Sequence, residues 1–158
     1  MKQWIAVILI STLFSESLTA GVGGRSAVYV GGTMKVKANT EFKQVETEGE
    51  ALQLVNKKER MEIPYKSVET LEYGQKVGRR IGSAIAVGVF TMGIGGLLAL
   101  SKKRRHFLSI TFKGEAGDTQ AAVIELGKEI TRPTLKILEV RTGKAIEYES
   151  EEARQNAR

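Results

Sequence analysis

The side chains on which most enzyme chemistry depends are scarce in this chain. Its 158 residues include one histidine, His106, one aspartate, Asp118, and no cysteine. A Cys–His arrangement is therefore excluded, a Ser–His–Asp arrangement could use only the single His106–Asp118 pair, and a histidine-based metal site lacks ligands. The glutamates include no pair that stands out as an acid–base couple. We expect a protein without catalysis, cofactor or metal.

The isolated candidates have simpler explanations. Asp118 falls in a predicted hairpin turn, where aspartate is common for backbone reasons. His106 lies between a basic run and a predicted strand. The glycine-rich stretches GVGG and GIGG lack the Lys-Ser/Thr of a phosphate-binding loop.

The positive charge is concentrated in one part of the chain. The formal net charge is +6, and residues 73–114 hold eight Lys or Arg residues and no acid. The other 16 basic residues are balanced by 18 acidic ones. The excess charge therefore belongs to the surroundings of residues 81–100, which are strongly apolar.

Residues 81–100 form a run of twenty residues without a charge, called the apolar segment below. As one helix it would be about 30 Å long, which matches the hydrocarbon core of a bilayer. The side chains expected to insert into a membrane are Ile81, Ile85, Val87, Val89, Phe90, Ile94, Leu97, Leu98 and Leu100. The basic residues expected to contact anionic head groups are Arg79, Arg80, Lys102, Lys103, Arg104 and Arg105.

Three arrangements of the apolar segment are open. A single span resembles a stop-transfer segment, but it would separate the strands before and after it. The clustered Gly93, Gly95 and Gly96 favour a turn, so that the segment dips into one leaflet and returns. The third arrangement is an apolar helical pair packed against the protein or another copy. We favour the dip, because it leaves both flanks on one side of the membrane.

Glycine spacing also bears on self-association. Gly78, Gly82 and Ala86 recur every four residues, and Gly88 follows in the same run. Such spacing lets helices approach closely, which would support a homo-oligomer.

Residues 1–20 have the layout of an export signal. Lys2 supplies a positive start, an apolar run of eleven residues covers 4–14, and small or polar residues follow. Eleven apolar residues are too few to span a bilayer as a helix, which favours a cleaved signal over a permanent anchor or a buried first element. We expect an exported, membrane-associated protein of a bacterial cell envelope.

The remaining chain is predicted to be strand-rich. Residues 27–30 are a short strand candidate, and residues 33–37 are a candidate continuation. Alternating apolar residues on either side of Asn56 predict a hairpin that ends at Pro64. Further strands are predicted at residues 68–73, 107–112 and 121–126, the last two joined by the turn KGEAGD.

Residues 127–143 change to a helical period, with Pro133 expected in the first turn and Gly143 just past the end. The apolar face comprises Ile130, Ile137 and Leu138, with Leu135 and Val140 at its edges. This amphipathic helix would cap the sheet. Residues 147–158 are a charged tail with nothing to bury, and they are predicted to be solvated.

The order of these elements, together with the stretch MEIPYKSVETLEYG, resembles bacterial pleckstrin-homology-like (PH-like) and GRAM-like domains of unknown function. In those domains a hairpin ends in an Ile-Pro pair, a turn follows, and the next strand carries spaced apolar residues. The stretch AAVIELGKEITRPTLKILEVRTGK would supply their closing helix. The resemblance implies an α+β, mainly β fold: a small antiparallel sheet capped by a C-terminal amphipathic helix, with an apolar helical insertion between strands.

The domain would cover residues 26–146, interrupted by the insertion at residues 78–105. Two features depart from the family. Lys35 and Lys37 are the only basic residues between Gly32 and Lys43, whereas phosphoinositide-binding members carry a basic pattern in their first hairpin. A glycine-rich apolar insertion is also not general in the family. The resemblance therefore implies a binding module without naming its ligand.

These features predict a non-enzymatic binding module that its apolar insertion tethers to the envelope membrane. Its body would present a sheet edge or groove to a protein, peptide or lipid ligand. The alternative is a self-assembling structural envelope protein whose Gly-rich segment is a helix–helix interface. Nucleic acid is not the expected partner of the basic run, which adjoins apolar residues and lacks interleaved aromatic side chains.

Overall fold

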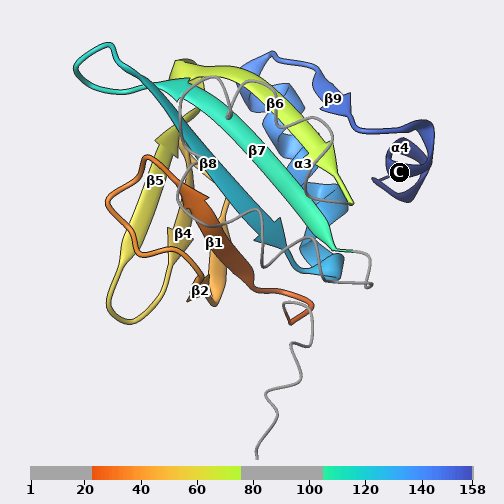
Figure 1. Ribbon diagram of the computed structural model, residues 1–158, viewed down its shortest axis with the longest axis horizontal. Helices are drawn as coiled ribbons and strands as arrows, with labels where there is room; N and C mark the ends of the chain where they lie inside the picture. Colours follow the sequence, from red (N-terminus) through yellow and green to blue (C-terminus); the bar gives the residue numbers. More distant parts are fainter. Residues whose placement is uncertain (1–22, 76–104, 158) are drawn as a thin grey trace, which may run out of the picture.

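The computed structural model describes residues 23–75 and 105–157, which form a mainly β structure (Figure 1). The strands are β1 (Ala27–Gly32), β2 (Thr40–Phe42), β3 (Gln44–Glu46), β4 (Ala51–Val55), β5 (Arg60–Pro64), β6 (Val68–Gly74), β7 (His106–Lys113), β8 (Thr119–Leu126) and β9 (Ile146–Tyr148). The helices are the 3-10 turn η1 (Tyr65–Ser67), α3 (Lys128–Thr142) and α4 (Glu151–Ala157). The predicted export signal lies outside the described residues.

The described strands form two sheets. The larger has the order β2-β1-β8-β7-β6-β9, and the smaller has the order β3-β4-β5. Only Lys43 separates β2 from β3, so the chain passes directly from one sheet into the other. The smaller sheet is antiparallel, as expected, but the larger one is mixed because β9 pairs with β6 in parallel.

Both predicted hairpins are confirmed. In β4 and β5, Leu52 lies opposite Ile63 and Leu54 opposite Met61, and all four side chains are buried. At the turn, the side-chain oxygen of Asn56 accepts hydrogen bonds from the backbone N–H groups of Lys58 (2.8 Å) and Glu59 (2.7 Å). Strands β7 and β8 pair over their whole length.

The strands before and after the predicted insertion belong to one sheet. Strand β6 pairs with β7, and β1 pairs with β8, both antiparallel. This arrangement confirms the expectation on which a one-domain interpretation depends, namely that the two halves of the chain fold together.

The predicted continuation of the first strand over residues 33–37 is wrong. Strand β1 extends to Gly32, and the chain then bends through residues 33–39 toward β2. Thr33 fixes the bend by donating its backbone N–H to Ala121 O (2.9 Å) and accepting from Ala121 N through its hydroxyl (3.0 Å). Gly32 has φ 152°, and a Cβ there would meet the carbonyl oxygen of Ala121, so only glycine fits this approach.

The predicted helix is confirmed as α3, and Gly143 ends it in the left-handed conformation with φ 66°. Three details differ. Pro133 lies beyond the first turn, because the helix already begins at Lys128. Leu135 is at the centre of the buried face, whereas Val140 is 75% exposed. Two threonines, Thr131 and Thr134, complete the buried face; Thr131 donates its hydroxyl to Gly127 O (2.9 Å), and such bonds let threonine face a core.

The prediction that residues 147–158 form a solvated tail is wrong. Residues 146–148 form β9, and α4 follows it; together these two elements are called the C-terminal return below. The return buries Ile146 and two alanines, Ala153 and Ala157. The prediction assumed that this segment needed large apolar side chains in order to pack on the body. It is held instead by the pairing of β9 with β6 and by the packing of small side chains.

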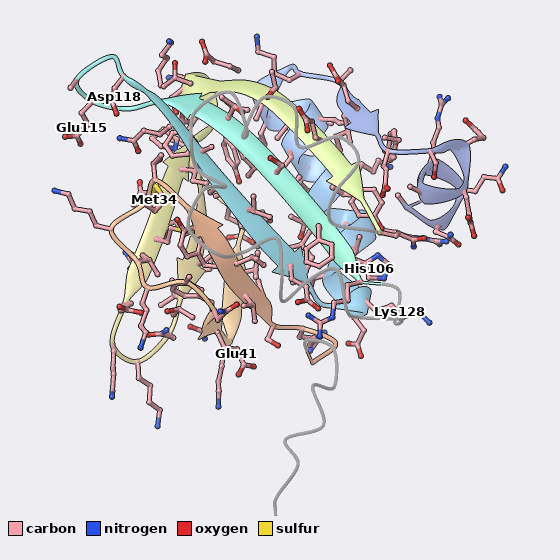
Figure 2. The ribbon with its side chains drawn as sticks, in the orientation of Figure 1. Met34, Glu41, His106, Glu115, Asp118 and Lys128 are labelled. Carbon is pink, nitrogen blue, oxygen red and sulfur yellow. The ribbon has the colours of Figure 1, made fainter. Side chains whose placement is uncertain are left out.

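The core lies between the two sheets and α3, which covers one face of the larger sheet (Figure 1). Figure 2 places His106 and Lys128 at one end of the larger sheet, and Glu115 and Asp118 at the hairpin turn of the opposite end. The end of β6 and the start of β7, which flank residues 76–104, lie at the same end of the larger sheet as His106.

Candidate functional site

The described residues include little of the predicted membrane-contacting set. The predicted inserting residues, the six glycines Gly78, Gly82, Gly88, Gly93, Gly95 and Gly96, and the five head-group residues Arg79, Arg80, Lys102, Lys103 and Arg104 all lie outside them. Arg105 is the one predicted site residue that the structure describes. The described residues include the base of residues 76–104, which is the part of the body where β6 ends and β7 begins.

The two sides of this base are adjacent strands. In the β6–β7 register, Gly74 lies opposite Phe107 and Tyr73 opposite Leu108. Gln75 follows β6 and Arg105 precedes β7, and they are the last described residues on each side. Because neighbouring strands are about 5 Å apart, the chain leaves and re-enters the body at nearly the same place.

The C-terminal return holds the β6 side of the base. The backbone N–H of Gln75 donates to the carboxylate of Glu149 (3.0 Å), and the Asn156 side chain donates to the side-chain oxygen of Gln75 (3.2 Å). The backbone N–H of Glu149 donates to Tyr73 O (2.8 Å). A Cβ at Gly74 would lie 2.6 Å from the Glu149 carboxylate, so a larger residue there would require the Glu149 side chain to shift.

A buried ion pair holds the β7 side. The Arg105 guanidinium lies 3.3 Å from a carboxylate oxygen of Glu125 on β8. The side chains are only 15% and 7% exposed. Arg105, predicted to contact lipid head groups, lies beside Glu125 on a strand of its own sheet.

Tyr73 and His106 connect the two sides. The Tyr73 hydroxyl lies 2.5 Å from His106 Nδ1, and the two rings are stacked with centroids 6.1 Å apart. Burial raises the pKa of Tyr73 to about 12, so this hydroxyl keeps its proton and donates it. Burial, with a further contribution from the Lys128 charge, lowers the pKa of His106, so Nδ1 is the neutral acceptor.

A series of side-chain hydrogen bonds therefore connects the two sides of the base. The Asn156 side chain donates to Gln75, the Gln75 amide hydrogen-bonds Tyr73, and Tyr73 donates to His106. On its other side Tyr73 meets the ring of Tyr148 edge-on, with centroids 5.9 Å apart. These contacts join α4, β6, β7 and β9 at one point.

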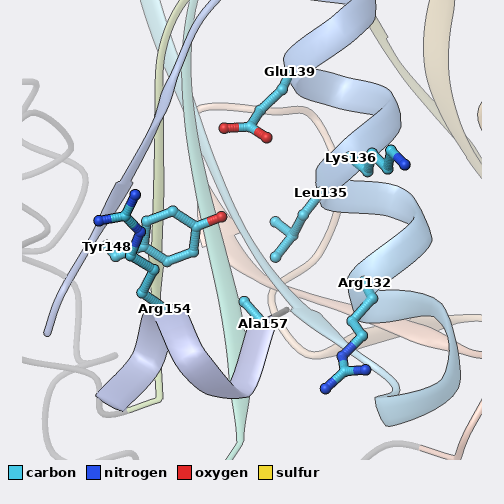
Figure 3. Close-up of a pocket in the computed structure, with 7 residues that line it drawn as sticks. All are labelled: Arg132, Leu135, Lys136, Glu139, Tyr148, Arg154 and Ala157. Carbon is cyan, nitrogen blue, oxygen red and sulfur yellow. The ribbon is translucent and has the colours of Figure 1, made fainter. Parts of the chain in front are cut away.

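A groove adjoins the base on the side of α3 (Figure 3). Its volume is about 490 Å³, and it lies between α3 and the C-terminal return. Figure 3 shows the Tyr148 hydroxyl pointing toward Leu135 of α3. The residues that line it are Arg132, Leu135, Lys136, Glu139, Tyr148, Arg154 and Ala157.

The groove has an apolar floor and a basic rim. Leu135 and Ala157 are buried, and the rim carries three basic residues, Arg132, Lys136 and Arg154, and one acidic residue, Glu139. Arg154 also pairs with Glu151 at 3.8 Å. Among the described residues neither Arg132 nor Lys136 forms an ion pair. A volume of this order is typical of small-ligand sites.

Metal-ligand clusters and membrane-spanning helices are both absent from the part of the chain that the structure describes. Within residues 23–75 and 105–157, no group of three His, Cys, Asp or Glu side chains could hold a metal ion. Over the same residues, no helix has the length and apolar character needed to cross a membrane.

The sequence interpretation missed the residues of the C-terminal return that build the base and the groove. A signal for α4 was present: Ser150 precedes two glutamates, and its hydroxyl accepts the backbone N–H of Ala153 (3.1 Å) as an N-cap does. Tyr148 and Glu149 carried no local signal, because their partners on β6 lie more than seventy residues earlier.

Comparison of the chain with protein-family models, curated proteins and solved structures gives no match in any of the three.

Proposed function

We propose that this protein is a non-enzymatic binding module of the bacterial cell envelope, exported by residues 1–20 and tethered to the membrane by its apolar segment. The observation that carries the proposal is the pairing of Gly74 with Phe107. It makes residues 76–104 an appendage that starts and ends at one place on a folded body. A single span would need the bilayer to lie between two hydrogen-bonded strands, so the dip into one leaflet is the arrangement that we propose.

The basic residues on both sides of the apolar segment support this geometry. Both flanks leave the body at the same end of the sheet, so both can meet the same membrane surface. Arg79, Arg80, Lys102, Lys103 and Arg104 would contact anionic head groups, each contributing about 1 kcal/mol. Arg105 would instead anchor the base through Glu125.

We assign the body to the PH-like and GRAM-like type. The features that support this are the β4–β5 hairpin ending in Ile63-Pro64, the turn η1, the strand β6 and the closing helix α3. The groove between α3 and the C-terminal return would be the binding surface. Its basic rim favours a ligand that carries negative charge.

Replacing residues 76–104 by a short Gly-Asn turn tests the tether. The Gly74–Phe107 register allows such a turn without moving a strand, so the variant should unfold cooperatively at an unchanged temperature. It should also lose co-sedimentation with vesicles that contain anionic phospholipid. The matched control is the full chain with Arg79, Arg80, Lys102 and Lys103 changed to Gln, which should lose most of its preference for anionic over neutral vesicles.

Two outcomes would contradict the proposal. The outer face of the larger sheet carries Phe107, Ala121 and Val123, which are buried although they are not part of the main core cluster. If the deletion lowers the unfolding temperature and exposes this face to a hydrophobic dye, the apolar segment packs on the protein. If the shortened protein still binds vesicles, the body binds lipid and the segment is not the tether.

The self-assembling alternative predicts a different response. Changing Gly82 and Gly88 to Leu should abolish oligomers if the Gly-rich segment is a helix–helix interface. The same change should leave vesicle binding largely intact if the segment is a tether.

A further inference from the structure

Strand β5 is an edge of the smaller sheet. It pairs with β4 on one side, and on its other side none of the described strands pairs with it. Figure 1 shows β5 at the outside of the molecule, far from the base. An unpaired strand edge is a template for pairing with another chain.

Two backbone hydrogen bonds at the ends of the hairpin show which residues of β5 face β4. The backbone N–H of Tyr65 donates to Glu50 O (2.9 Å), and that of Asn56 donates to Glu59 O (3.0 Å). In an antiparallel pair, hydrogen-bonded and non-bonded positions alternate. The bonded positions after Glu59 are therefore every second residue up to Tyr65.

It follows that Met61 and Ile63 form the hydrogen bonds to β4, and that their side chains face the core. The N–H and C=O groups of Arg60 and Glu62 point to the opposite side, toward the free edge. Pro64 ends the edge, since it has no N–H to offer.

The side chains of this edge are charged and alternate in sign. Arg60 and Glu62 are both exposed and lie on the same outer face of the strand. Neither forms an ion pair with another described residue. Charged side chains protect a strand edge where they would lie opposite like charges of a partner strand, whereas opposite charges across two strands attract. The β5 edge carries a basic residue, Arg60, and an acidic residue, Glu62, two positions apart.

We propose that β5 pairs with β5 of a second copy of this chain. With the two strands antiparallel about a two-fold axis at Met61, Arg60 of each copy lies opposite Glu62 of the other. Both positions have their N–H and C=O groups at the edge, so each pair exchanges both main-chain hydrogen bonds. The two cross-strand ion pairs form on the solvent face.

The self-complementarity of the edge is what identifies the partner. A two-fold interface needs each surface patch to match its own rotated copy. The order of a basic residue, a spacer and an acidic residue satisfies this requirement in the antiparallel register. A second copy of the chain is therefore sufficient to complement the edge. The contact is small, so we expect weak association, which would be stronger when copies lie on the same membrane surface. The pairing of β5 with β5 does not depend on the proposed tether.

Charge reversal tests the interface in the full chain, solubilised in detergent. R60E gives an edge with two acids, and E62R gives one with two bases. Each variant alone should raise the dimer dissociation constant about tenfold or more, measured by sedimentation equilibrium, because both cross-strand pairs change from attraction to repulsion. The double variant R60E/E62R should recover the dimer, since its pairs are reversed but complementary.

Mixing provides the sharpest readout. R60E and E62R, each weakened alone, should form a mixed dimer when combined. E62P is the backbone control: it removes an outward N–H without breaking a bond to β4, so it should weaken the dimer and leave the circular dichroism spectrum unchanged.

The proposal is overturned if the wild-type chain stays monomeric at the highest attainable concentration. It is also overturned if association is indifferent to the charges at positions 60 and 62, or if mixing the two variants restores nothing. A dimer that ignores these charges and is lost in G82L belongs to the Gly-rich segment.

Discussion

The β7–β8 and β6–β7 pairs are neighbours in one sheet, yet their registers are fixed in different ways. Strands β7 and β8 are joined by a short turn in which Gly114 N donates to Asp118 O (2.8 Å) and Gly117 N donates to Gly114 O (2.9 Å). Strands β6 and β7 are separated in the sequence by residues 75–105. Their register is held by neighbouring strands and by contacts from residues distant in sequence.

The difference shows where each pair is vulnerable. The β7–β8 turn is local, and its geometry depends on a few residues such as Gly117, which has φ 79°. The base of residues 76–104 depends instead on Glu125 for Arg105 and on Glu149 and Asn156 for Gln75. The register of β6 and β7 therefore does not require a short local turn between them.

The largest effect is expected from breaking the ion pair at the base. Glu125→Gln leaves the Arg105 guanidinium buried beside a neutral group, and removing one partner of such a pair costs about 3–5 kcal/mol. The free energy of unfolding from urea titration should fall by this amount. Replacing both residues by apolar ones, as in R105M/E125L, should restore most of the loss. An unchanged stability of E125Q would mean that the base is not held by this pair.

A smaller effect is expected from the β7–β8 turn. Gly117→Ala places a side chain in open space, since nothing lies within 4 Å of its Cβ position, so only the left-handed backbone is penalised. The expected loss is about 1–2 kcal/mol in the same titration. If G117A lowers the free energy of unfolding more than E125Q does, the β7–β8 turn contributes more to stability than the Arg105–Glu125 pair.

The smallest effect concerns His106 and pH. Its folded-state pKa lies below the ordinary value of 6.5, so the unfolded chain binds the proton more readily. Stability should therefore fall as the pH drops below about 6.5, and the loss should be complete once the pH passes below the folded pKa. H106N should flatten this dependence between about pH 7.5 and 5.5, where the carboxylates stay ionised. Equal slopes for H106N and the parent would exclude His106 as the cause.

Local pattern was sufficient for much of the fold. The hairpin around Asn56 was predicted because apolar residues alternate on both sides of a turn whose side chain fixes the backbone. Helix α3 was predicted because its apolar residues recur with the helical period and because Gly143 marks its C-terminal end. Pattern failed where long-range contact decides the structure, as in β9, whose partner is a strand far away in the chain.

The candidate site was predictable only in part. The apolar segment and its basic flanks are visible in the sequence, but the assignment of Arg105 to head groups failed to anticipate Glu125 as its partner. Nothing local to Glu125 distinguishes it from exposed glutamates, because its burial follows from lying between β1 and β7. Likewise, Tyr148 enters the groove only because β9 adds to the sheet edge.

The passage from β2 to β3 through Lys43 has a consequence for how the protein opens. Residues 40–46 contribute a strand to each sheet, so local opening of one sheet should also break hydrogen bonds in the other. Amide hydrogens of β4, in the smaller sheet, and of β1, in the larger, should then exchange with the same opening free energy, as one cooperative unit.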